Sequence, residues 1–218
     1  ASNNTAVGYN ALLANTTGVN NTGIGYQALS ANIDTHSCVG VGYQAGKDAT
    51  ASYTTAVGDR AMSQATVTGT HNTAVGHYSA ANLTSGHSNS AAGSNALSGN
   101  TTGNQNTAIG YSALVSNTTA DNNTGIGKSA LQNNTTGTQN TAVGSNLLYT
   151  NTTGSYNTAL GYSALFSSTT ASTNTALGAY ALQADTTGGS NTAIGYNALY
   201  ANTTAGHNLA IGVEALKD

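Results

Sequence analysis

The sequence contains no proline and no tryptophan, and only one phenylalanine, one methionine and one cysteine among 218 residues. Charge is equally scarce, with four Lys or Arg and seven Asp or Glu. So few cations cannot follow several nucleic-acid phosphates, and scattered carboxylates do not form an acidic calcium cage. The lone Cys38 cannot make an intrachain disulfide. We therefore expect no nucleic-acid partner, no metal and no cofactor.

Long apolar runs are also missing. No segment approaches the roughly 20 apolar residues that a membrane-spanning helix needs, so we expect no membrane insertion. No charged segment followed by an apolar one marks a signal peptide, and any targeting segment is expected to lie outside this chain. Low charge with high polarity would suit a disordered chain, but the sequence is too regular for that interpretation.

What the sequence does contain is a 17-residue repeat. The motif Asn-Thr-Ala-Val-Gly begins at Asn4 and returns every 17 residues, except for intervals of 16 and 18 around Thr54 that cancel. Thirteen repeats form one domain over residues 1–218, and their positions are numbered 1 to 17 below. The repeats begin at residues 4, 21, 38, 54, 72, 89, 106, 123, 140, 157, 174, 191 and 208.

The repeat alternates with a period of two at its start. Thr5, Val7 and Tyr9 would face one way and Ala6 and Gly8 the other, as in a β-strand. The Asn-Thr-Thr-Gly block at positions 12 to 15 is turn chemistry, with Gly in a left-handed conformation that Asn tolerates. Seventeen residues are too few for a helical hairpin or a propeller blade. The pattern predicts an all-β fold, a parallel β-solenoid of thirteen coils and roughly 60 Å.

Uniform positions should then form ladders along the rod. The aliphatic residues of positions 4 and 9 are predicted to make its apolar seam, Ala and Gly to keep it thin, and Asn side chains to hydrogen-bond between coils. Position 5 is Gly in every repeat, which predicts positive φ or a close backbone approach. This structural ladder comprises Gly8, Gly25, Gly42, Gly58, Gly76, Gly93, Gly110, Gly127, Gly144, Gly161, Gly178, Gly195 and Gly212.

Two sets of side chains are candidates for contact with sugars. Position 6 often holds tyrosine, which predicts a broken aromatic stack able to contact glycans: Tyr9, Tyr26, Tyr43, Tyr111, Tyr162 and Tyr196. Position 12 often begins an Asn-x-Ser/Thr sequon at the predicted turn, a candidate row of N-glycosylation sites: Asn15, Asn100, Asn117, Asn134, Asn151 and Asn202. The alternative for the second set is that Asn-Thr-Thr simply favours a turn.

Catalytic chemistry finds no support. No nucleophile lies beside a paired base, and no carboxylate pair is spaced for acid–base work, so we predict that the protein is not an enzyme. The charged residues Lys47, Asp48, Asp59 and Arg60 fall in the irregular repeats and predict a local bulge or loop. The histidines are expected at the surface or in turns: His36, His71, His77, His87 and His207.

The Asn-Thr-Ala-(Val/Ile)-Gly motif followed by Ala-Leu resembles the head repeats of YadA-like trimeric autotransporter adhesins and the related shafts of bacteriophage tail fibres. The resemblance implies a left-handed parallel β-roll in which three chains pack side by side through aliphatic and small residues. Head repeats of that family are usually shorter than 17 residues, and this chain carries no anchor, coiled-coil stalk or chaperone domain. A thin coil also buries little apolar area alone, which separately favours a homotrimer over a monomer.

These observations predict a non-enzymatic, extracellular fibre segment. It would be a rigid shaft of a virion tail fibre or a cell-surface adhesin that presents or provides attachment to surface glycans. One alternative is a filament subunit that stacks end to end, because no capping segment covers the strand edges at either end. We favour a fragment of a longer fibre over that filament. A further alternative is an ice-binding solenoid. Two features argue against it: the sequence has no clean Thr-x-Thr rank on one strand, and tyrosine interrupts the surface.

Overall fold

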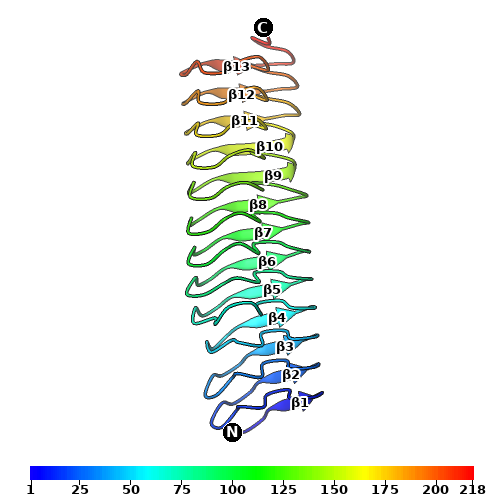
Figure 1. Ribbon diagram of the computed structural model, residues 1–218. Coiled ribbons are helices and arrows are strands. Elements are labelled where there is room, and N and C mark those ends of the chain that lie inside the picture. Colours follow the sequence, from blue (N-terminus) through cyan, green and yellow to red (C-terminus); the bar gives the residue numbers. More distant parts are fainter.

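The computed structural model describes residues 1–218 and confirms the parallel β-solenoid. Its single sheet has thirteen strands in sequence order, each parallel to the next. Figure 1 shows the coils stacked into an elongated rod with the two termini at opposite ends. The strands are β1 (Thr5–Val7), β2 (Thr22–Ile24), β3 (Val39–Val41), β4 (Thr55–Val57), β5 (Thr73–Val75), β6 (Ser90–Ala92), β7 (Thr107–Ile109), β8 (Thr124–Ile126), β9 (Thr141–Ser145), β10 (Thr158–Tyr162), β11 (Thr175–Leu177), β12 (Thr192–Ile194) and β13 (Leu209–Ile211).

The register places equivalent residues of the repeat against one another. Thr158 of β10 lies beside Thr141 of β9 and Thr175 of β11, and Ala159 lies between the alanines of the same two strands. One-residue slips would turn every side chain to the opposite face of the sheet, so this pairing fixes which columns lie inside. Every position of the repeat therefore forms a ladder along the rod.

The remaining sides of each coil are held by hydrogen bonds between coils as well. Only 26 of the 137 backbone hydrogen bonds lie within the strands. In the seventh coil, Leu114 N donates to Ala130 O of the next coil at 3.0 Å, whereas Ser112 N donates to Ser94 O of the preceding coil at 3.0 Å. Because all sides of the coil are bonded upward and downward, the rod resists bending on every side.

The core is thinner than the sequence pattern predicts. Position 3 of each strand points inward, and with positions 8 and 9 it supplies the buried apolar residues, such as Ala108, Ala113 and Leu114. The predicted apolar seam at position 4 is wrong, because the strand alternation turns that column outward with position 2: Ile109 is 44% exposed. The predicted seam at position 9 is confirmed.

Left-handed backbone occurs at unexpected positions. Non-glycine residues at positions 7, 9 and 17 adopt positive φ, among them the buried Leu114 at 52°. The glycine of the Asn-Thr-Thr-Gly turn is not among the residues with positive φ, so that part of the turn prediction is wrong. Gly103 is small for another reason: a Cβ there would lie 2.4 Å from the carbonyl oxygen of Ala120.

The position-5 glycines satisfy both parts of their prediction. Gly110 has φ of +128°, and a Cβ on it would lie 2.6 Å from the carbonyl oxygen of Gly127 in the next coil. Positive φ disfavours any L side chain, and the contact is with backbone that the inter-coil hydrogen bonds hold in place. This column therefore admits no other residue without a shift of the stack.

The irregular third and fourth coils keep the sheet intact. Val39 still pairs with Thr55, so the missing and extra residues are absorbed on the far side of the coil, where Ala49 forms an isolated bridge with Val67. Position 12 turns apolar over three coils, with Ala49, Val67 and Leu83 buried in place of asparagine. At the predicted bulge, apolar side chains therefore replace the asparagines of position 12, and apolar packing replaces their hydrogen bonds.

Replacing Gly110 with alanine should lower the free energy of unfolding by about 3 kcal/mol, because it adds both backbone strain and a clash. Gly189→Ala is the matched control, since its Cβ would meet only Ser172 O at 3.2 Å and its φ is ordinary. Chemical denaturation followed by circular dichroism measures both. Equal losses in the two variants would contradict the role assigned to the position-5 column.

Candidate binding surfaces and the amide ladders behind them

The outer face of the sheet is the largest candidate surface. We call it the Thr/aliphatic face. It comprises the side chains at positions 2 and 4 of every repeat, which lie on the strands, and it contains no charged residue. More than half of its large aliphatic side chains at position 4 are exposed, among them Ile109 at 44%, and the others, such as Ile126, are half-buried. Long apolar stripes on a soluble surface are typical of interaction sites.

A second surface is the line of aromatic side chains at one edge of that face. Tyr9, Tyr26 and Tyr43 are stacked with ring centroids 5.3 and 5.2 Å apart, and the Arg60 guanidinium lies 5.2 Å from the Tyr43 ring. The predicted broken stack is confirmed, because Asp59 follows Tyr43 at position 6. Within this stack the ring faces cover one another, which leaves edges and hydroxyls to solvent.

The tyrosines near the C-terminal end are arranged differently. Tyr180 meets Tyr196 edge-on, with centroids 6.1 Å apart and planes at 81°. Tyr180, Tyr196 and Tyr200 line a shallow depression together with Gln183, Asn197 and Lys217. Edge-on packing covers the face of only one ring in each pair, and the amides beside the rings provide both donors and acceptors.

Charged groups are dispersed over the surface. All five histidines are exposed, as expected, and His77 Nε2 lies 3.4 Å from Asp59 Oδ2. Asp48 pairs with the adjacent Lys47 at 3.7 Å, and Asp59 lies in the next coil rather than opposite it as a catalytic pair. No group of three or more His, Cys, Asp or Glu side chains is close enough to hold a metal ion.

Two asparagine columns lie inside the rod, and their amides converge on one carbonyl in each regular coil. Asn123 Nδ2 at position 1 and Asn134 Nδ2 at position 12 both donate to the position-15 carbonyl of Gly137, at 2.8 and 2.9 Å. Asn134 Nδ2 also donates to Asn117 Oδ1 of the preceding coil at 3.0 Å, and Asn140 N donates to Asn123 Oδ1 at 2.9 Å. The predicted cross-coil bonding of asparagines is confirmed.

This arrangement corrects the glycosylation prediction. Asn100, Asn117, Asn134 and Asn151 are fully buried, with their Nδ2 atoms donating inside the rod. A sugar attached to Nδ2 would have to occupy the core, so the folded rod carries no exposed sequon edge at these four positions. The sequence shows the turn but cannot show that its asparagine points inward.

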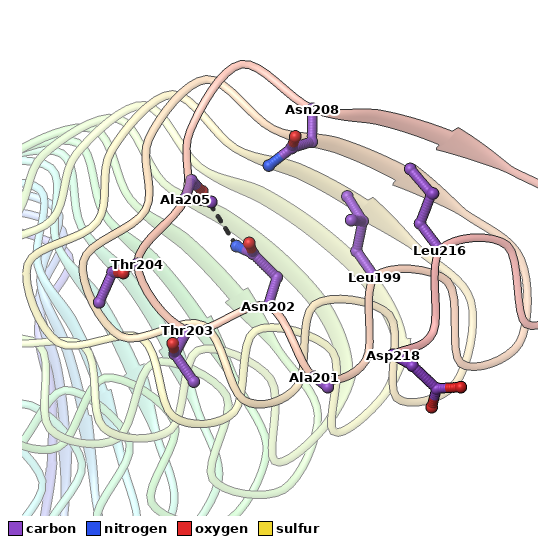
Figure 2. Close-up of a pocket in the computed structure, with 9 residues that line it drawn as sticks. All are labelled: Leu199, Ala201, Asn202, Thr203, Thr204, Ala205, Asn208, Leu216 and Asp218. Carbon is purple, nitrogen blue, oxygen red and sulfur yellow. Dashed lines mark hydrogen bonds between the residues drawn. The ribbon is translucent and has the colours of Figure 1, made fainter.

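One carboxylate belongs to the same ladder. Asp185 takes position 12 of the eleventh coil, and burial raises its pKa to about 7. Its Oδ1 accepts hydrogen bonds from Gly188 N at 3.1 Å and from Asn202 Nδ2 of the next coil at 2.9 Å. Figure 2 shows Asn202 at the C-terminal end, where its amide also donates to the Ala205 carbonyl beside the ends of Leu199 and Leu216. Sequence reasoning missed Asp185, although an acid within an asparagine column was the signal.

No family model matches the chain, and neither the curated proteins nor the solved structures contain a significant match. The structure has no helix of the length and apolar character needed to cross a membrane.

One asparagine of the position-12 ladder lacks hydrogen-bond partners, and it allows the stabilising effect of the ladder to be tested. Asn32 is fully buried beneath the apolar segment of position 12, and neither its Nδ2 nor its Oδ1 has a hydrogen-bond partner. Asn32→Leu should raise the free energy of unfolding by about 1 kcal/mol, because it removes an unsatisfied amide from a column that already accepts Leu83. Asn117→Leu should lower it by about 3 kcal/mol, since the amides of Asn100 and Asn134 lose their partner.

Urea denaturation of the two variants beside the parent chain measures both effects. A gain in both variants would show that the hydrogen-bonded amides do not stabilise the rod beyond their packing, and a loss in both would contradict the cost assigned to the unpaired amide of Asn32.

Proposed function

We propose that the chain is a non-enzymatic shaft segment of an extracellular fibre, on a virion tail or a cell-surface appendage. The observation that carries this proposal is the Thr/aliphatic face, an uncharged stripe that follows the whole rod. Uniform ladders give stiffness and length but no enclosed site, a combination that suits a spacer more than a catalyst. The likeness of the repeat motif to adhesin heads and phage fibre shafts agrees with this role.

The same face favours a side-by-side homotrimer. Position 4 alone contributes large exposed side chains such as Val75, Ile109, Leu160 and Ile211, each at least 41% exposed. Parallel rods of identical pitch would bring these ladders together along their full length, and each buried Val, Leu or Ile side chain contributes about 1.5–3 kcal/mol. Threonine at position 2 supplies hydroxyls at the rim of such an interface.

The double variant Ile109→Asp and Ile126→Asp should convert the trimer into single chains, because two carboxylates per chain would be buried without partners. Light scattering coupled to size-exclusion chromatography measures the change, a threefold fall in mass. Thr136→Asp is the control, since Thr136 is exposed on the turn away from the face and its replacement should leave the mass unchanged.

A parent chain of single-chain mass would exclude the trimer and leave the face open to solvent. Thermal hysteresis at micromolar protein would then support the ice-binding alternative. The rows of threonine and aliphatic side chains on one face favour that alternative. Concentration-dependent growth beyond three chains would instead support end-to-end stacking into a filament.

Glycan attachment is best placed at the C-terminal depression. A sugar ring packs its C–H face against the face of an aromatic ring, and the exposed rings of Tyr196 and Tyr200 provide such a surface beside Gln183 and Asn197. The stacked Tyr9, Tyr26 and Tyr43 offer mainly edges. The proposed contact is a neutral saccharide, because Lys217 in the same depression is already paired with Glu214 at 3.1 Å.

Binding to a printed array of bacterial surface glycans tests this assignment. Tyr196→Ala with Tyr200→Ala should reduce binding to the recognised glycans at least tenfold, which corresponds to about 1.4 kcal/mol. Tyr26→Ala should leave it unchanged. Loss of binding in the Tyr26 variant alone would move the contact to the stacked tyrosines, and no binding by the parent chain would refute glycan attachment through this segment.

A further inference from the structure

The position-12 asparagine ladder ends at Asn151 and is interrupted on the next two coils near the C-terminal end. Asn151, Ser168 and Asp185 occupy this column in the ninth, tenth and eleventh coils, and all three are fully buried. Asn151 Oδ1 and Ser168 Oγ have no hydrogen-bond partner. In the regular ladder, by contrast, Asn151 Nδ2 donates to Asn134 Oδ1 at 2.8 Å. Two oxygens that elsewhere would be satisfied therefore lie unpaired directly before Asp185.

The orientation of the Asp185 carboxyl follows from its partners. Oδ1 accepts from Asn202 Nδ2 of the next coil, as the Oδ1 of a ladder asparagine does. Oδ2 therefore takes the place of an asparagine Nδ2, the atom that elsewhere donates both to the position-15 carbonyl and to the preceding coil. Here that carbonyl is Gly188 O, which accepts from Asn174 Nδ2 at 2.7 Å and has one acceptor direction to spare.

An ionised Oδ2 would be poorly stabilised at this position. It would set a negative oxygen where a ladder asparagine carries the amide that donates to the position-15 carbonyl. The one donor that reaches Oδ2 is Asn174 Nδ2, whose hydrogen bond to Oδ2 is long at 3.5 Å, whereas the same amide donates to Gly188 O at 2.7 Å. The charged groups of the following coils are His207, Glu214, Lys217 and Asp218, and none of them makes a hydrogen bond or ion pair with Asp185.

We propose that the rod contains a buried proton-binding site in which Asp185 is neutral, its Oδ2–H replacing the missing asparagine amide as a donor to Gly188 O. The proton supplies the bond to the position-15 carbonyl that an asparagine amide supplies in the regular coils, without a change of fold. No cavity opens at this position that could hold a cation, so the proton is the ligand that fits. Burial, which raises the pKa of Asp185 to about 7, acts in the same direction.

The site makes the C-terminal coils sensitive to pH. Because the folded pKa lies above that of the unfolded chain, the contribution of the proton is fully present below about pH 4 and is lost as the pH rises through about 7. Over that interval the unfolding equilibrium constant of these coils should rise by up to tenfold per pH unit relative to a chain with asparagine at this position.

Carbon-13 NMR of the carboxyl groups tests the proposal directly. The chain has six aspartates, and Asp185→Asn identifies the resonance of Asp185 by its disappearance. That resonance should titrate near pH 7. The melting temperatures of the parent and the Asp185→Asn variant should agree near pH 4 and diverge towards pH 7, the parent being lower, whereas exposed Asp34→Asn should follow the parent. Titration near pH 4, or parallel melting profiles, would overturn the proposal.

A second substitution tests the orientation of the carboxyl. Ser168→Asn rebuilds the ladder one coil earlier, with Nδ2 directed towards Asn151 Oδ1 and Oδ1 towards Asp185 Oδ2. A second acceptor beside the proton should keep or raise the midpoint of the Asp185 titration. A midpoint lowered towards pH 4 would mean that the new amide donates to a carboxylate, and it would refute the protonated donor assigned here.

Discussion

The rod depends on hydrogen bonds between equivalent groups of successive coils. Asparagine at positions 1 and 12 connects the two halves of each coil through the position-15 carbonyl, and the same amides reach the neighbouring coils. Buried polar groups are costly unless satisfied, and here each regular coil satisfies those of the next. This explains how a coil with a few alanines and one leucine as its apolar core holds a definite shape. It also means that register errors are penalised on all sides of the coil at once.

The exceptions show that the column tolerates exchange when neighbouring coils change together. Ala49, Val67 and Leu83 replace asparagine over three coils, and position 9 accordingly shrinks from Leu29 to Gly46 and later to Ala80. Packing volume moves from one column to the other while the sheet register is kept. The exchange leaves polar groups unpaired at two places. At the start of the apolar segment the side chain of Asn32 has no hydrogen-bond partner, and near the C-terminal end Ser168 is too short to continue the ladder.

Much of this architecture could be predicted from the repeat, because in a solenoid periodicity fixes which residues touch. The coil number, the parallel sheet, the position-5 glycines and the tyrosine stack followed from spacing alone. Which face of the strand points inward did not follow: Ala108 and Ile109 alternate, and only packing shows that the smaller one lies inside. The left-handed conformation of Leu114 was equally hidden, because leucine has no preference for it, and the neighbouring coil imposes it through the Ala130 carbonyl.

The contrast between an interior whose polar groups are hydrogen-bonded and an outer face that exposes apolar side chains bears on function. Inside, most donors meet an acceptor in their own coil or the adjacent one, so the interior has little capacity left for ligands. Outside, the Thr/aliphatic face repeats an apolar side chain with every coil and no charge limits its approach to an identical surface. A ladder of identical residues is complementary above all to another ladder of the same pitch. For a thin rod whose coils each bury few large side chains, the proposed association along this face would provide apolar burial that a single chain lacks.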